Sequence, residues 1–299
     1  MSITKSAEQR GGEMRLQEMT VEGGNEKAPV FDIEQEIGDP EKQIWRSIID
    51  KICKKEDWGN VTSHLSSASM LFPEEIDSVV KSKWGEGTTV GDSIIVQAKK
   101  DIAEQVANTN HSNKKEAVVW LVSGIKAVFP DFPISELGAD DAFNYWFEGE
   151  KLKEIPSWTA RGLLITFADL QVIFPEKMRN SRQNLETNAW PEIMEELAEL
   201  RKKGSWRQFA INARFTRIAF PDKFQELEIK EEDWREMKNT LDASRDKGDW
   251  GEFFLIAECM KVLAAREVIV DEKGLRLVMP EKTGDFKEEK PELPVRRKF

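Results

Sequence analysis

The sequence predicts an all-α fold, an α-solenoid-like array of about five tandem helix hairpins that ends in a short C-terminal β-hairpin. Three observations predict it. Residues of the same type recur at a spacing of 44 positions, Phe-Pro pairs recur four times, and tryptophans stand where helices are expected to begin. An internal period of about 40–47 residues is typical of stacked helix pairs of the HEAT and armadillo types.

The period joins several residue types in the same order along the chain. The pairs 44 residues apart are Trp190 and Trp234, Gly204 and Gly248, Trp206 and Trp250, Phe209 and Phe253, and Ala213 and Ala257. The Phe-Pro pairs are Phe72-Pro73, Phe129-Pro130, Phe174-Pro175 and Phe220-Pro221, at steps of 57, 45 and 46 residues. We therefore divide residues 41–266 into five units, 41–80, 84–137, 139–180, 184–226 and 228–266.

Each unit is predicted to hold two helices. Trp190, Ile193 and Leu197 fall on one face of a first helix, because their spacing matches a 3.6-residue turn. Thr187 or Asn188 is a plausible N-cap for that helix, and it would place Pro191 in the first turn, where a missing N–H costs little.

The turn between the two helices also has a recognisable pattern. Gly204 and Gly248 follow basic residues, which predicts a helix end with a left-handed glycine just beyond it. Ser205 and Asp249 come next and are predicted N-caps of the second helix. Phe-Pro should end that second helix, because proline cannot donate to the helical ladder.

The repeated aromatic residues are predicted to form the core of the array rather than a stacking surface for sugars or bases. These residues are Trp45, Trp58, Trp158, Trp190, Trp206, Trp234, Trp250, Phe209 and Phe253. Truncation of a core aromatic such as Trp206 to alanine should therefore cost about 3–5 kcal/mol.

The two ends of the chain differ from the helical region. In residues 267–280, apolar residues alternate around Asp271 and Gly274, which predicts a β-hairpin that caps the last unit. Residues 1–40, which are acidic, and residues 281–299 are predicted to be disordered tails.

Composition excludes several classes of protein. The chain of 299 residues carries 44 basic and 55 acidic residues, a net charge of -11, which disfavours a general nucleic-acid binder. No apolar run is long enough for a membrane span, and residues 1–15 lack a secretory signal, so we expect a cytoplasmic protein without a membrane partner. Two cysteines, Cys53 and Cys259, read as small buried hydrophobic residues rather than a disulfide framework or zinc site.

Candidate chemistry is sparse. The glycine-rich loop at 85–91 lacks the Lys-Ser/Thr of a phosphate-binding loop. His64 has serines nearby in the sequence and His111 lies in a polar turn, but nothing in the sequence fixes a nucleophile, a base and an orienting group within mutual reach. Asp140 and Asp141 are better explained as the start of a helix than as paired acids. We therefore expect no enzyme activity, no cofactor and no metal site, with carboxylate chemistry as a less favoured alternative.

One segment opposes the acidic character of the chain. Residues 201–223 carry a net charge of +6, and a helical projection places a basic stripe between two apolar faces. The stripe either docks an acidic peptide or nucleic acid, or balances charge within the array. Its candidate partner-binding residues are Arg207, Arg214, Arg217, Lys202 and Lys203.

These observations favour a non-enzymatic scaffold or adaptor that binds a protein or peptide partner. A nucleic-acid-associated protein that uses the basic stripe is the alternative. The 44-residue period also bears on whether Arg214 is free to bind a partner. Glu258 lies 44 residues after Arg214, so parallel stacking predicts that the two side chains meet across neighbouring second helices. If they pair, Arg214 belongs to the structure and not to the docking stripe.

Overall fold

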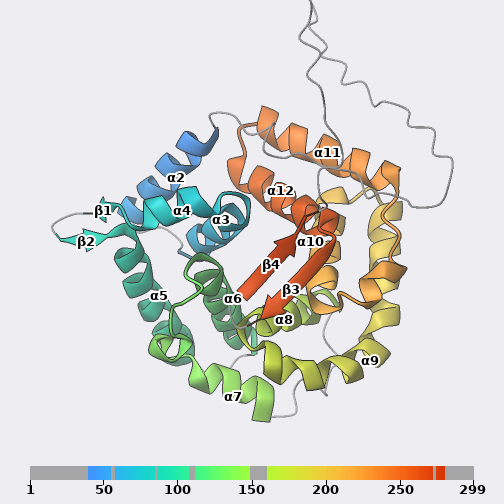
Figure 1. Cartoon of the computed structure of the whole chain (residues 1–299), viewed down its shortest axis with the longest axis horizontal. Coiled ribbons are helices and arrows are strands. Elements are labelled where there is room, and N and C mark those ends of the chain that lie inside the picture. Colours follow the sequence, from blue (N-terminus) through green and yellow to red (C-terminus); the bar gives the residue numbers. More distant parts are fainter. Residues whose placement is uncertain are drawn as a thin grey trace, which may run out of the picture.

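Two concentric layers of helices make up the fold (Figure 1). The computed structural model describes residues 40–54, 58–84, 87–107, 112–148, 160–271 and 274–279, and these are mostly helical, as predicted. The inner layer consists of α3 (Trp58–Leu71), α6 (Ser112–Val128), α8 (Ala160–Ile173), α10 (Trp206–Ala219) and α12 (Trp250–Ala264). The outer layer consists of α2 (Pro40–Lys54), α4 (Pro73–Val80), α5 (Val90–Ala107), α7 (Asp140–Glu148), α9 (Pro175–Lys202) and α11 (Glu231–Asp246).

The inner helices form a closed ring. Each contacts the next in the order α3, α6, α8, α10 and α12, and α12 returns to contact α3. At this closure the rings of Phe72 and Phe254 meet edge to face with centroids 6.0 Å apart, and Trp250 Nε1 donates to Gln43 Oε1 at 2.9 Å. The sequence predicted an α-solenoid-like array whose last unit is capped by the hairpin. The inner helices instead close on themselves, which buries the apolar faces that a stack with two ends would expose.

The Phe-Pro pairs end inner helices, as predicted. Phe72, Phe174 and Phe220 have nearly the same backbone conformation, with φ of -137°, -132° and -133° and ψ of 65°, 62° and 60°. Each backbone N–H still donates to the carbonyl four residues earlier, at 2.7–2.8 Å. Pro73 and Pro175 then begin α4 and α9, where their missing N–H is not needed.

The predicted turn geometry is present twice. Gly204 and Gly248 have φ of 66° and 68°, the left-handed region that glycine adopts without strain. Ser205 N donates to Leu200 O at 3.0 Å, and Asp249 N donates to Ser244 O at 2.9 Å. The Asp249 side chain caps α12 by accepting from Glu252 N at 3.1 Å, whereas Ser205 makes no such bond. Both residues therefore occupy the predicted N-cap positions, but only Asp249 makes the predicted side-chain bond, in keeping with the weaker acceptance of a neutral hydroxyl compared with a carboxylate.

The predicted start of a helix at Thr187 or Asn188 is wrong. Residues 175–202 form one helix, α9, which follows the rim of the ring, and Pro191 lies inside it rather than in a first turn. Neither Thr187 nor Asn188 begins a helix. A single proline removes one backbone hydrogen bond, and the buried side chains of Trp190 and Ile193 on either side of it pack the helix onto the core.

The C-terminal β-hairpin is present, but it covers a different surface from the one predicted. Strands β3 (Glu267–Asp271) and β4 (Gly274–Val278) pair antiparallel, with Glu267 opposite Val278. They contact α6, α8, α9 and α10 and cross the middle of the ring instead of capping the last unit (Figure 1). A closed ring has no terminal face to cap, so the apolar side of the hairpin packs on the inner helices.

Two short helices and a second small hairpin complete the described chain. The 3₁₀ helices are η1 (Ile134–Leu137) and η2 (Lys223–Glu226). Strands β1 (Lys83–Trp84) and β2 (Thr88–Thr89) pair antiparallel between α4 and α5, where the sequence indicated only a loop. The predicted tails lie outside the described residues except for Pro40.

The core depends more on phenylalanine than predicted. Phe209 and Phe253 are 0% and 1% exposed, and Trp190 is buried. Trp206, Trp234 and Trp250 pack against the core but are only half-buried. Trp206 meets Phe209 edge to face at 5.7 Å, and Trp250 meets Phe253 at 5.6 Å. Trp158 and the side chains of Trp45 and Trp58 lie outside the described part of the chain.

Candidate functional site

A layer of polar side chains crosses the middle of the ring. One residue from each inner helix belongs to this polar layer: Ser67, Ser123, Asp169, Arg214 and Glu258. The first four stand five or six residues before the Phe of a Phe-Pro pair. The polar layer was not predicted from the sequence, although polar residues at a shared distance from Phe-Pro are the pattern that indicates it.

The predicted contact between Arg214 and Glu258 is confirmed. The two side chains form an ion pair between α10 and α12, and Glu258 is only 1% exposed. Ser67 of α3 donates to the other carboxylate oxygen of Glu258 at 2.5 Å. Three inner helices thus meet at one buried carboxylate, and the ring closure between α12 and α3 runs through it.

Asp169 is the second carboxylate of the polar layer. Ser123 Oγ donates to its Oδ1 at 2.9 Å, while Asp169 Oδ2 and Arg214 Nε are buried without a hydrogen-bond partner among the described residues. Burial raises the pKa of Asp169 to about 7, against the opposing effects of the Ser123 hydrogen bond and the charge of Arg214. One positive charge, that of Arg214, therefore faces two buried carboxylates. Asp169 consequently keeps its proton to a higher pH than an exposed aspartate does.

The predicted basic stripe is mostly engaged within the protein. Arg217 donates to the backbone carbonyls of Ala265 and Arg266, which fastens the base of the C-terminal hairpin to α10. Arg207 forms an ion pair with Glu252, with Nε and Oε1 3.4 Å apart. Lys202 and Lys203 stay exposed at the end of α9, near Glu199.

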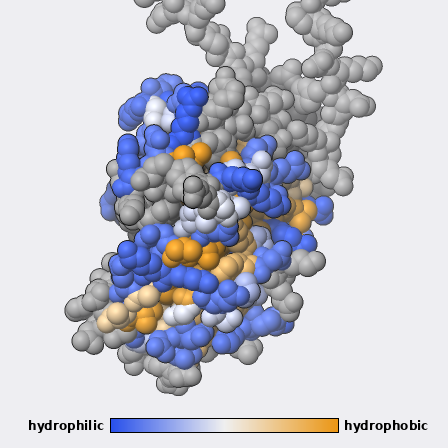
Figure 2. All heavy atoms as spheres, turned by 90° about the vertical axis from the view of Figure 1, so that its left-hand side faces the viewer, coloured by the Kyte–Doolittle hydropathy of each residue, from blue (hydrophilic) through white to orange (hydrophobic). Residues whose placement is uncertain are grey.

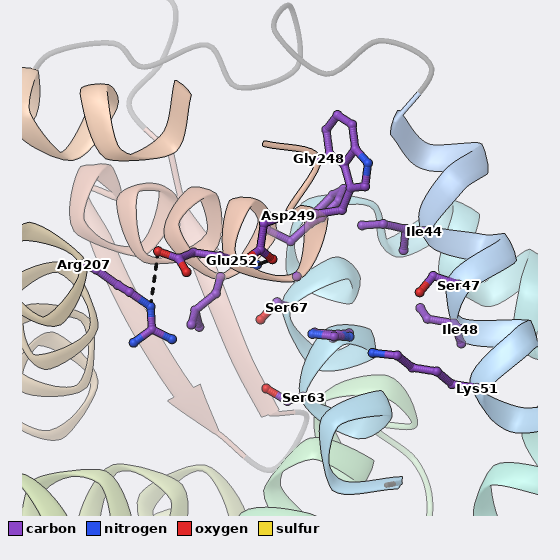
Figure 3. Close-up of a pocket in the computed structure, with 15 residues that line it drawn as sticks. Ile44, Ser47, Ile48, Lys51, Ser63, Ser67, Arg207, Gly248, Asp249 and Glu252 are labelled. Atoms are coloured by element: carbon purple, nitrogen blue, oxygen red, sulfur yellow. Dashed lines mark hydrogen bonds and ion pairs between the residues drawn. The ribbon is translucent and has the colours of Figure 1, made fainter. Parts of the chain in front are cut away.

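A polar cavity lies where the ring closes. This seam pocket, of about 450 Å³, lies between α2, α3 and the start of α12 and reaches Arg207 of α10 (Figure 3). Its polar lining includes Ser47, Lys51, Ser63, His64, Asp249 and Glu252. Ser67 also lines it, so the seam pocket adjoins the polar layer through one hydroxyl group.

Among the residues that line the seam pocket, His64 has a shifted pKa. Burial lowers its pKa below 6.5, the nearby positive charge of Lys51 lowers it further, and Asp249 partly opposes both. The imidazole lies against Gly251, since a Cβ at that position would be 2.5 Å from His64 Nε2. At neutral pH the ring is therefore an uncharged group with one donor and one acceptor nitrogen.

The seam pocket can hold a polar ligand by hydrogen bonding and charge. Ser67 donates to Glu258 and not to His64, and in the described residues no hydroxyl is hydrogen-bonded to the imidazole. Neither a group of three potential metal-ligating side chains nor a helix long and apolar enough to cross a membrane occurs among the residues that the structure describes.

Cys259, Asp140 and Asp141 do not line the seam pocket. Cys259 is buried, and burial raises the pKa of its thiol to about 12, as expected for an unreactive core cysteine. Asp140 and Asp141 begin α7, as predicted. His111 and the side chain of Cys53 lie outside the described residues.

The part of the surface that the structure describes exposes few large apolar side chains on which to base a site. The face in Figure 2 is mostly polar, with separate hydrophobic areas. Among the described residues, the large hydrophobic side chains that are exposed are Val96, Trp120 and Val278, on α5, α6 and β4. Scattered residues of this kind are ordinary on protein surfaces.

Comparison with known proteins finds no protein-family model, no characterised protein and no solved structure that matches this chain.

Proposed function

We propose that this chain is a non-enzymatic scaffold built from tandem copies of one helix pair, and that a protein or peptide partner docks at the seam pocket. The observation that carries the proposal is the seam pocket itself. It is a polar cavity of about 450 Å³ that exists because the first and last helix pairs meet. A cavity of this size suits one or two side chains of a partner.

The tandem-copy part of the proposal is supported by geometry that recurs at the sequence period. The Trp206–Phe209 and Trp250–Phe253 contacts are 44 residues apart and have interplanar angles of 76° and 78°. The left-handed glycines and their turns match in the same way. Independent helices have no reason to share turns, ring contacts and polar-layer positions, whereas copies of one unit do.

The seam pocket is a better docking site than the basic stripe. Arg214 donates to Glu258 and Arg217 donates to the base of the hairpin, so a partner would have to break internal bonds to engage either guanidinium group. The nucleic-acid alternative loses its main support for the same reason, because it depended on those cations. A cytoplasmic location and the absence of catalysis stay predictions.

A pull-down with the full chain tests the proposal. Ser47 is exposed on α2 and lines the seam pocket, so Ser47→Phe should fill the cavity without entering the core. Ser78→Phe, at an exposed position of α4, is the matched control. We expect at least one protein, identified by mass spectrometry, that co-purifies with the wild type and Ser78→Phe but is lost with Ser47→Phe. Partners retained equally by both variants would place docking elsewhere.

A further inference from the structure

The charges of the seam pocket are unevenly satisfied. Four side chains of fixed charge line it: Lys51, Arg207, Asp249 and Glu252. Arg207 and Glu252 pair with each other, and Asp249 caps α12 by accepting from Glu252 N. For the ammonium group of Lys51, the described residues provide no ion pair. Its half-buried side chain points into the cavity (Figure 3).

Uncharged donors line the same cavity as that ammonium group. Ser47 and Lys51 are four residues apart on α2, so they share a helix face, and both point toward α3 across the cavity (Figure 3). From α3, Ser63 and His64 line the same space. The hydroxyls of Ser47 and Ser63 and the imidazole have no hydrogen-bond partner within the described part of the chain, so each can donate to a ligand.

We infer that the seam pocket binds an oxyanion, the carboxylate or phosphate group of a ligand, with Lys51 as the charged donor and Ser47, Ser63 and His64 as neutral donors. The inference rests on the proposed function, in which the oxyanion belongs to an acidic or phosphorylated side chain of the partner. Charge-assisted hydrogen bonds to a carboxylate or phosphate are the strongest that such donors can make. A cationic ligand would instead face Lys51 and Arg207, with both pocket carboxylates already engaged.

The two histidines of the chain make the test direct. The full-length protein is isotope-labelled at histidine, and the His111→Gln variant assigns the two imidazole signals. Inorganic phosphate or acetate is then added stepwise while the two signals are followed by NMR. Chloride at the same ionic strength controls for screening. We expect a saturable shift of the His64 signal and a rise in the pKa of His64 at saturation, since a bound anion favours the imidazolium. His111 serves as the internal reference and should not respond in this way.

Two lysine variants on α2 locate the anion. Lys51→Met should weaken binding by about tenfold or more, the loss expected for a charged hydrogen-bond donor. Without anion, the same variant should raise the pKa of His64, because a neighbouring positive charge is removed. Lys54→Met removes an exposed charge from the end of the same helix and should leave binding unchanged.

The outcomes separate the two proposals. Saturation by phosphate but not acetate would identify a phosphoryl group as the ligand, and saturation by both would show that a carboxylate suffices. If His64 does not saturate, or responds equally in Lys51→Met, or merely follows His111, the anion site is rejected. A partner that still depends on Ser47 in the pull-down would then show that docking at the seam survives without an anion.

Discussion

Arg214 of α10 and Glu258 of α12 form an ion pair across two neighbouring inner helices, and they lie 44 residues apart in the sequence. Glu258 also accepts from Ser67 of α3. The pair therefore links α10 and α12 to α3 at the point where the ring closes.

Removal of one partner from this ion pair should be strongly destabilising. Arg214→Ala leaves the carboxylate of Glu258 buried with one hydroxyl donor, and we expect a loss of about 3–5 kcal/mol in the free energy of unfolding. A double-mutant cycle with Glu258→Ala, measured by chemical denaturation, should give a coupling energy above about 1 kcal/mol. The exposed pair Lys81–Asp77 is the control, with coupling below about 0.5 kcal/mol. Equal couplings for the two pairs would show that burial adds nothing.

Stability should depend on pH through Asp169. Its pKa is about 7 in the folded protein and 3.8 without the fold, so between these values the folded state keeps a proton that the unfolded state has lost. Protonated Asp169 therefore contributes to the free energy of unfolding in full below pH 3.8. This contribution, roughly 4 kcal/mol, is lost as the pH rises to about 7.

Asp169→Asn removes that titration. The free energy of unfolding of both proteins is measured from pH 4 to 8. As the pH rises, the wild type should lose the stability contributed by Asp169 and the variant should not, so the variant becomes more stable relative to the wild type. Because both proteins share every other titrating group, parallel profiles would mean that Asp169 is ionised in the folded state at neutral pH.

Helix packing between α3 and α6 should depend on Gly124. A Cβ there would overlap Thr62 Cγ2, and Thr62 is a buried, β-branched residue with little freedom to move. Gly124→Ala should therefore destabilise the protein by about 1–3 kcal/mol, although alanine is the better helix former. In a Thr62→Ser background, which lacks the obstructing methyl group, the same change should be neutral or stabilising. A loss that persists in that background would place the obstruction elsewhere.

Phe209 should matter more than Trp206. Phe209 is fully buried, and its truncation to alanine should cost about 3–5 kcal/mol. Trp206 is half-buried above it, so Trp206→Ala should cost roughly 1–3 kcal/mol, less than the repeat pattern alone suggests. Thermal denaturation of the two variants ranks them. A larger loss for Trp206 would restore tryptophan as the principal core residue.

Local features of the fold were predictable because short stretches of chain encode them. Phe-Pro ends a helix through the missing N–H of proline, and glycine after a basic turn adopts a left-handed conformation, whatever lies elsewhere in the molecule. The predictions failed where packing outweighed such local preferences. Pro191 continues α9 because buried side chains on both sides of it hold the helix on the core.

The candidate site was less predictable than the helices. His64 is an ordinary polar residue in the sequence, and its pKa is lowered only when folding buries it, in part against Gly251, and brings the positive charge of Lys51 near it. The basic stripe was visible in the sequence, but its internal partners, apart from Glu258, were not.

The sequence by itself determined the helix pairs, most of their ends, and the register that sets Arg214 opposite Glu258, since these follow from spacing and short-range hydrogen bonding. Only the tertiary structure decided that the ring closes and that the hairpin crosses its middle. Closure depends on small rotations between successive helix pairs that add up over the whole chain, and no single residue encodes their sum. Ser67 and Glu258 are 191 residues apart, and they form a hydrogen bond, with the pocket beside it, because the inner helices close into a ring.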